Sequence, residues 1–148
     1  MLDTPVSVLA RRPPVRVQRR TPIAEAARLL REEKTRCLAV MDGDALVGIF
    51  TDRDMAEKCF SAAVSGETEV GLVMNSPVIS VAPDSSMREA LQLLDRERMR
   101  HLPLVEADGT LRAIIRARDI LSYMAEAMPE AILNQPLAPL SPWTREGA

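Results

Sequence analysis

Short apolar segments alternate along the chain with stretches in which apolar residues recur at helical spacing. Six segments have the length and composition of strands: residues 15–17, 37–40, 46–50, 78–81, 102–105 and 111–115. Two stretches predict amphipathic helices, with apolar positions at Ile23, Ala26, Ala27 and Leu30 and at Met87, Ala90, Leu91 and Leu94. The pattern therefore predicts a protein that mixes helices and strands throughout its length.

The residues at the expected helix starts are types that favour helix initiation. Thr21-Pro22 predicts an N-cap followed by proline at the first helical position. Asp84-Ser85 offers caps for the corresponding helix later in the chain. Two further helices are expected to begin near Thr51 and near Arg116, each directly after an apolar strand.

The chain contains an internal duplication, which becomes visible when the sequence is shifted by 64 residues. Residues 25–30, Glu-Ala-Ala-Arg-Leu-Leu, then fall on residues 89–94, Glu-Ala-Leu-Gln-Leu-Leu. One extra residue near Asp108 changes the offset to 65, and residues 53–54 then fall on residues 118–119, both Arg-Asp. Because the matches keep this order over most of the chain, they indicate a tandem duplication.

Each copy has the element order β-α-β-β-α, and a unit of this size is too small to bury a comfortable core alone. Copies at residues 5–63 and 68–126 would bury their sheet faces against each other around a pseudo-twofold axis. The predicted fold class is therefore α/β, in the α+β sense, with two repeats packed face to face. Residues 129–148 contain four prolines and are expected to form a loosely ordered C-terminal tail.

Composition narrows the classes of function. The chain has 148 residues, of which 47% are apolar and 27% charged, and its net charge of -2 provides no overall attraction to nucleic acid or anionic lipid. No stretch approaches the roughly 20 apolar residues of a membrane span. Residues 1–20 lack the hydrophobic region of a secretory signal, so Cys37 and Cys59 are expected to be reduced thiols in the cytoplasm.

Catalytic and metal-binding constellations are also missing from the sequence. His101 is the single histidine, which excludes zinc sites built on several histidines or on Cys/His quartets. No serine lies in a sequence that resembles a nucleophile elbow. We therefore expect neither a metal site nor an enzyme.

The junction between the third strand and the next helix of the first copy reads Gly48-Ile49-Phe50-Thr51-Asp52-Arg53-Asp54. This segment resembles the Gly-hydrophobic-x-Thr/Ser-x-x-Asp signature of the cystathionine β-synthase (CBS) domain. Residues 100–105, Arg-His-Leu-Pro-Leu-Val, and residues 81–84, Val-Ala-Pro-Asp, resemble further phrases that are common in CBS domains. The resemblance covers about residues 5–125 and indicates a stand-alone pair of CBS domains.

The resemblance implies a regulatory, signal-transducing module. Paired CBS domains bind adenosine-containing ligands in two clefts between the repeats, so the implied ligand is an adenine nucleotide (AMP, ADP or ATP), with S-adenosylmethionine or NAD as further options. No cofactor is required. The implied assembly is a homodimer, and a regulated protein partner is a further expectation. The alternative is an interaction module with degenerate nucleotide sites that dimerises or tethers a partner protein.

Gly48, Thr51 and Asp54 are the leading candidates for ligand binding. A strand that leads into a helix N-terminus presents backbone N–H groups that favour an anion, and Gly48 would let a ligand approach the backbone closely. Thr51 would donate to a phosphate or cap the helix, and the Asp54 carboxylate would accept hydrogen bonds from a ribose diol. The same spacing is close to that of a capping box, which is the purely structural alternative.

The second copy departs from the signature, because Ala113 and Arg116 replace the glycine and the threonine while Asp119 is retained. Arg116 faces the positive end of the helix dipole, yet it can reach a phosphate as a cation. It can equally fill the cleft or pair with a carboxylate. We therefore expect a better site at Asp54 and a weak or altered site at Asp119.

Other polar candidates have simpler alternatives. Arg36 and Arg100 occupy equivalent positions in the two copies, where the resemblance implies contacts with phosphate. His101 is either a further phosphate contact or a half-buried polar residue. Arg53 and Arg118 either touch phosphate or face solvent, and solvent is the preferred expectation for both.

Three apolar residues of the first copy, Val15, Val17 and Ile23, are expected to line the adenine side of the Asp54 site, although they also fit an ordinary core. Near them lies a basic cluster, formed by Arg11, Arg12, Arg16, Arg19 and Arg20. It has no interleaved aromatic residues for stacking on bases, so a solvated basic edge is favoured over a nucleic-acid patch or a polyphosphate clamp.

Overall fold

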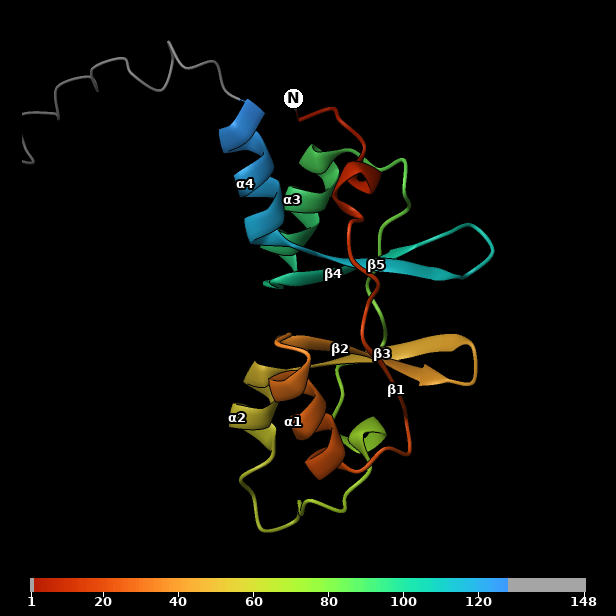
Figure 1. Cartoon of the computed structure of the whole chain (residues 1–148), viewed down its shortest axis with the longest axis vertical. Helices are drawn as coiled ribbons and strands as arrows, with labels where there is room; N and C mark the ends of the chain where they lie inside the picture. Colours follow the sequence, from red (N-terminus) through yellow and green to blue (C-terminus); the bar gives the residue numbers. More distant parts are fainter. Residues whose placement is uncertain (1, 128–148) are drawn as a thin grey trace, which may run out of the picture.

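The computed structural model describes residues 2–127, which form two units stacked along the long axis (Figure 1). The first unit contains β1 (Arg16–Gln18), α1 (Ile23–Glu32), β2 (Cys37–Asp42), β3 (Ala45–Thr51) and α2 (Asp52–Lys58). The second contains α3 (Met87–Arg96), β4 (His101–Val105), β5 (Leu111–Arg116) and α4 (Ala117–Ala127). The 3-10 helices η1 (Val6–Leu9) and η2 (Val70–Leu72) precede them. The predicted tail, residues 129–148, lies outside the described residues.

The two sheets differ by one strand. In the first unit β1 pairs in parallel with β2, which pairs antiparallel with β3, whereas the second sheet contains only β4 and β5. The predicted strand at residues 78–81 is therefore wrong, because Val81 alone bridges Leu104. In the first unit, the N–H of Ala39 in β2 donates to the carbonyl of Val15. Pro103 of β4 occupies the position equivalent to Ala39. Because proline has no N–H, this hydrogen bond cannot form in the second unit.

The helix starts also differ from the expected caps. Thr21 makes no capping hydrogen bond to α1, so that expectation is wrong. The N–H of Ile23 donates instead to the carbonyl of Thr68, 2.9 Å away, so a later segment of the chain satisfies this donor. Helix α3 does have a side-chain cap, and it is supplied by Ser86 rather than by Asp84-Ser85.

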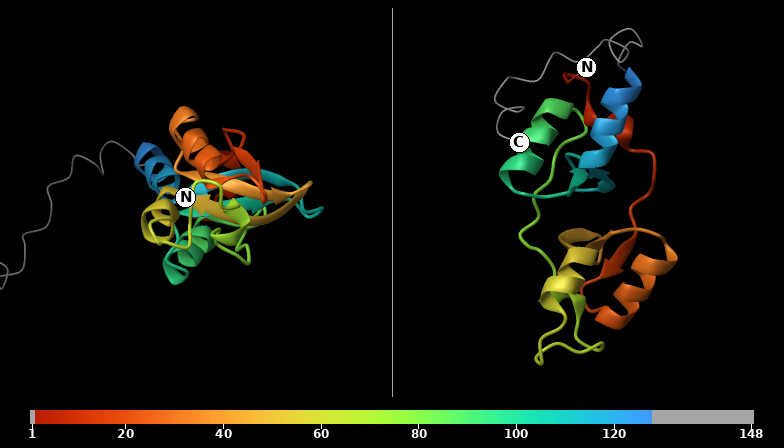
Figure 2. Two further views of the ribbon diagram at one scale, coloured as in Figure 1. Left: turned by 90° about the horizontal axis from the view of Figure 1, so that it is seen from below. Right: turned by 90° about the vertical axis from the view of Figure 1, so that its left-hand side faces the viewer.

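The leading segment of each copy, which is the stretch before its first α-helix, packs on the other copy. Val6 of η1 is fully buried in the core of the second unit, and Val70 of η2 is fully buried in the core of the first. The N–H of Met87 donates to the carbonyl of Thr4, which repeats the contact at the start of α1. Figure 2 shows the two connecting segments passing between the units. The units are therefore held together by two chain crossings.

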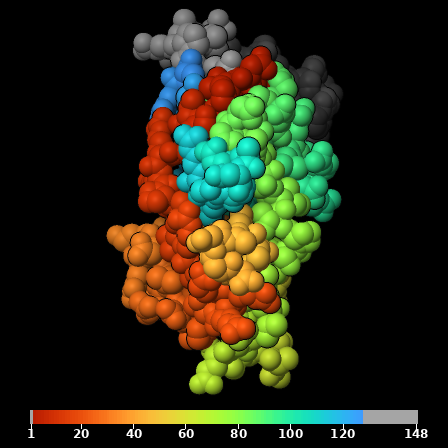
Figure 3. Space-filling view, turned by 90° about the vertical axis from the view of Figure 1, so that its right-hand side faces the viewer, coloured from red at the N-terminus to blue at the C-terminus, as the bar shows by residue number. Residues whose placement is uncertain are grey.

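The sheets of the two units face each other, as the duplication predicted. Ala39 and Met41 of β2 are buried together with Leu111 of β5, in a small core distinct from the two main ones. The turn between β2 and β3 lies next to the turn between β4 and β5 on the surface opposite the helices (Figure 3). The packing of the two sheets fixes the β3–α2 junction of the first unit relative to the β5–α4 junction of the second.

Candidate functional site

Two clefts lie between the units, one beside each strand-to-helix junction. The Asp54 cleft has a volume of about 600 Å³ and is lined from residues 49–58, 74–79 and 97–101. The Asp119 cleft has a volume of about 1010 Å³, and it is lined mainly from residues 9–15, 33–37 and 113–126. Asp52, Arg100 and His101 border both. Each cleft thus combines a junction of one copy with the leading segment of the other.

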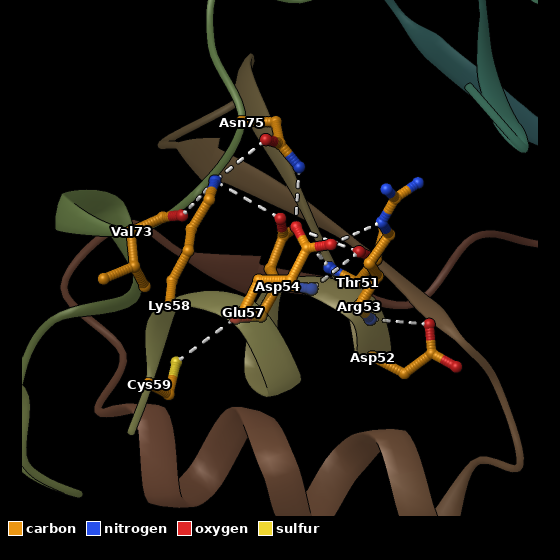
Figure 4. Close-up of polar contacts among 9 residues, drawn as sticks. All are labelled: Thr51, Asp52, Arg53, Asp54, Glu57, Lys58, Cys59, Val73 and Asn75. Atoms are coloured by element: carbon orange, nitrogen blue, oxygen red, sulfur yellow. Dashed lines mark hydrogen bonds and ion pairs between the residues drawn. The ribbon is translucent and has the colours of Figure 1, made fainter. Parts of the chain in front are cut away.

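The Asp54 carboxylate is buried and surrounded by donors (Figure 4). Its Oδ2 atom accepts from the N–H of Thr51 at 2.8 Å, from the Thr51 hydroxyl at 3.0 Å and from the amide of Asn75 at 2.7 Å. Its Oδ1 atom has one charged neighbour, the Lys58 ammonium at 3.2 Å. Oδ1 is therefore the carboxylate atom with remaining acceptor capacity.

Lys58 and Asn75 are functional candidates that we did not single out from the sequence. Lys58 lies four residues after Asp54 on α2, a spacing that places two side chains on one helix face and provides a signal for this pair. Its ammonium also donates to the side chain of Asn75 and to the carbonyl of Val73. Asn75 has no comparable signal, because the fold brings it from 21 residues away.

Gly48 has a different role from the expected one. A Cβ atom at this position would lie 2.9 Å from the carbonyl oxygen of Asn75 and would overlap the sulfur of Met74. Ile49 and Asn75 exchange two backbone hydrogen bonds at this point of closest approach. The expectation that Gly48 admits a ligand is therefore wrong: it admits the segment that carries Asn75 to Asp54.

The first N–H groups of α2 are already bonded within the protein. The N–H of Asp52 donates to the carbonyl of Arg36, and the N–H of Arg53 donates to the Asp52 carboxylate. The N–H of Asp54 donates to the Thr51 hydroxyl, which completes a capping box. The structural alternative for Thr51, a capping box, is therefore confirmed, and a phosphate contact of Thr51 and these N–H groups stays a prediction.

The apolar wall of the Asp54 cleft comes from the second copy. Val78 and Ile79 line it, and Ile79 is the repeat equivalent of Val15. Val15 lines the Asp119 cleft instead, while Val17 and Ile23 are buried and line neither cleft. The expected adenine wall of Val15, Val17 and Ile23 is thus wrong, because the leading segments are exchanged between the units.

Among residues 2–127, Asp119 has a single partner, Arg116. Arg116 donates to it through its backbone N–H at 3.0 Å and through its guanidinium, with a shortest distance of 2.6 Å to Oδ1. Burial raises the pKa of Asp119, but the hydrogen bonds from Arg116 outweigh it, so the pKa is lower than usual. Both oxygens accept from Arg116, so of the alternatives for Arg116 the structure shows pairing with a carboxylate.

The remaining polar candidates divide between the clefts. Arg36 and Arg118 line the Asp119 cleft, whereas Arg53 lines the Asp54 cleft and pairs with Glu57. Arg53 and Arg118 are exposed, in agreement with the preferred expectation for them. Arg100 borders both clefts.

His101 is half-buried between the two clefts. Burial lowers the pKa of His101, and Arg116, Arg100 and Arg36 lower it further against the opposing charge of Asp52. Because burial is the largest cause, the lowered pKa reflects the loss of solvent around the imidazole more than the charges near it.

The cysteines do not supply a reactive nucleophile. Burial, with the nearby Asp54 and Asp52, raises the pKa of the Cys37 thiol to about 12, and burial also raises that of Cys59. Residues 2–127 contain no group of three or more His, Cys, Asp or Glu side chains that could hold a metal ion. Within the same residues, no helix is long and apolar enough to cross a membrane.

Comparison with known proteins identifies the family. The sequence matches the CBS domain over residues 6–61 and again over residues 69–126. It is 33% identical over 113 residues to the CBS domain-containing protein YhcV of Bacillus subtilis, covering 76% of this chain and 81% of YhcV. The chain therefore belongs to the CBS domain family. CBS-domain proteins are typically regulatory modules.

Solved structures share the fold. A CBS domain protein from Pyrobaculum aerophilum, complexed with AMP, is similar with a TM-score of 0.73 and 23% identity, over 83% of this chain and 99% of that one. The cytosolic domain of the Mg²⁺ channel MgtE in complex with ATP is similar with a TM-score of 0.63 and 25% identity. This second match covers 74% of this chain and 44% of the MgtE chain.

Proposed function

We propose that this CBS pair is a regulatory module that binds an adenosine-containing ligand in the Asp54 cleft. The ribose diol donates to Oδ1 of Asp54, and Lys58 turns away to make room for it. The adenine packs against Val78 and Ile79, which line the same cleft. The observation that carries the proposal is a buried carboxylate, with one oxygen still able to accept, at the wall of a cleft of about 600 Å³.

The proposed ligand is an adenine nucleotide of the AMP, ADP or ATP class. Two structurally similar proteins have been solved with AMP and with ATP, which supports this class over S-adenosylmethionine or NAD. The cleft contains Arg98, Arg100 and His101 opposite Asp54, and these side chains offer positive partners for phosphate. The ligand thus touches both copies at once.

A ligand that touches both copies changes the balance between their arrangements. It favours whichever arrangement gives it the tighter contacts, and the shape or the dimerisation of the module then reports its concentration. We infer a homodimer acting on a protein partner in the cytoplasm, where Cys37 and Cys59 stay reduced. The module performs no chemistry of its own, and neither nucleic acid nor a membrane is its partner.

The second candidate function is an interaction module with degenerate sites. The pairing of Asp119 with Arg116 favours it, because no oxygen of Asp119 remains without a donor from Arg116. The two candidates differ in whether nucleotide binding occurs at the Asp54 cleft.

Calorimetric titration with AMP, ADP, ATP, S-adenosylmethionine and NAD tests the proposal. We expect binding by at least one adenine nucleotide with a Kd in the micromolar range, about -8 kcal/mol. The control ligand is the 2′,3′-dideoxy analogue of the nucleotide that binds most tightly. This analogue lacks both ribose hydroxyls. It is expected to bind at least about tenfold more weakly, because two hydrogen bonds to a carboxylate are lost.

Two outcomes contradict the proposal. Absence of heat with every ligand, at two temperatures and with protein whose melting is cooperative, would favour the interaction module. Equal binding of the nucleotide and its dideoxy analogue would place the ribose elsewhere than on Asp54.

A further inference from the structure

The Asp119 cleft is bordered by an unusual number of cations without partners. Six basic side chains line it and make no ion pair within residues 2–127: Arg11, Arg12, Lys34, Arg36, Arg100 and Arg118. They come from three separate segments of the chain, namely the N-terminal segment, the end of α1, and the β4–β5–α4 region. Like charges gathered without partners create a positive field that attracts a polyanion.

The Asp54 cleft lacks this imbalance. Its cations include Arg53, paired with Glu57, and Lys58, paired with Asp54. Only Arg98 and Arg100 line it without an ion pair in the described part of the chain. The two clefts therefore differ in charge, although they arise from equivalent positions of a duplicated chain.

Seven cations line the Asp119 cleft, and they outnumber its four acids, which are Glu33, Asp52, Asp119 and Glu126. Asp119, the carboxylate that the repeat places at the ribose position, accepts from Arg116 with both oxygens. A ribose diol would have to displace a charge-assisted, two-pronged contact there.

We propose that the Asp119 cleft is a binding site for an oligophosphate chain, free or carried by a nucleotide, and that the phosphates rather than a nucleoside hold the ligand there. Arg36 and Arg118 face the chain from opposite copies, while Arg11 and Arg12 close the site from the exchanged N-terminal segment. The basic cluster at the N-terminus is thereby divided: Arg11 and Arg12 belong to this site, whereas Arg19 pairs with Asp42. The site is independent of ribose recognition at Asp54.

Inorganic tripolyphosphate is the probe, titrated calorimetrically into the whole chain without magnesium at about 50 mM salt, where screening is modest. We expect it to bind the Asp54→Asn variant as tightly as the wild type, which separates this site from the nucleotide site. The double variant Arg36→Gln/Arg118→Gln, which keeps the Asp54 cleft intact, is expected to bind at least about tenfold more weakly. Orthophosphate is expected to bind at least about tenfold more weakly than tripolyphosphate.

The matched control is Arg20→Gln/Arg31→Gln, which removes the same charge from exposed positions that line neither cleft. It is expected to retain tripolyphosphate binding within about threefold of the wild type. Equal weakening of both double variants would overturn the proposal, because it would indicate attraction by net charge alone. Binding of ATP but not of tripolyphosphate to Asp54→Asn would overturn it as well, because a nucleoside would then be required. Thermal melting of each variant verifies that it is folded.

Discussion

Replacing Gly48 with valine is expected to lower the free energy of unfolding by about 3 kcal/mol. The added Cβ would stand 2.9 Å from the carbonyl oxygen of Asn75, a backbone atom that cannot swing aside. The segment at residues 74–75 would have to move away from β3, and the two hydrogen bonds between Ile49 and Asn75 would be lost. Urea unfolding, followed by circular dichroism, measures the change.

The second copy provides the control for this substitution. Ala113 occupies the position equivalent to Gly48, and no bridge links residue 114 to residue 11 among the described residues. Ala113→Gly is therefore expected to cost only about 1 kcal/mol, through the flexibility of glycine in a strand. A Gly48→Val protein as stable as the wild type would mean that the approach of Asn75 does not depend on a missing side chain.

Replacing Asp54 with alanine is expected to lower the free energy of unfolding by about 2 to 3 kcal/mol. The substitution removes half of the capping box of α2 and leaves the buried N–H of Thr51 without its acceptor. It also leaves the ammonium of Lys58 without its charged partner. Nucleotide binding is expected to disappear in the same variant.

Asp52→Ala is the matched control, since it removes a carboxylate from the same helical turn. Asp52 is exposed, and in the described part of the chain its carboxylate accepts only from the N–H of Arg53, so the expected cost is below about 1 kcal/mol. Similar melting temperatures for the two variants would show that the contacts of Asp54 contribute nothing beyond a generic helix start.

Much of the fold could be predicted from the sequence, from its apolar periodicity and its internal duplication. The strands at residues 37–40, 46–50, 102–105 and 111–115 and all four helices are found close to their predicted places, because apolar periodicity is a local property. The prediction of a strand at residues 78–81 was wrong, and the reason is also present in the sequence. Pro103 removes a single donor from the partner strand, and that donor is needed for the pairing.

The site was harder to predict, because each cleft is formed by a strand-to-helix junction of one copy and the leading segment of the other copy. Thr51 and Asp54 were singled out because their segment resembles the CBS signature, yet the wall opposite them was assigned to Val15, when Ile79 lines this cleft. Both residues fit the same pattern, and only the path of the chain decides which cleft each one lines. The contact of Asn75 with Asp54 depends on the same path, and so no local signal could reveal it.

A crystal structure of the chain grown with AMP tests the central claim most directly. We predict AMP in the Asp54 cleft, with a ribose hydroxyl within hydrogen-bonding distance of Oδ1 of Asp54 and the Lys58 ammonium displaced from it. The adenine is expected to lie against Val78 and Ile79. AMP bound elsewhere, or AMP in this cleft with the Lys58–Asp54 pair intact and the ribose away from Asp54, would contradict the account.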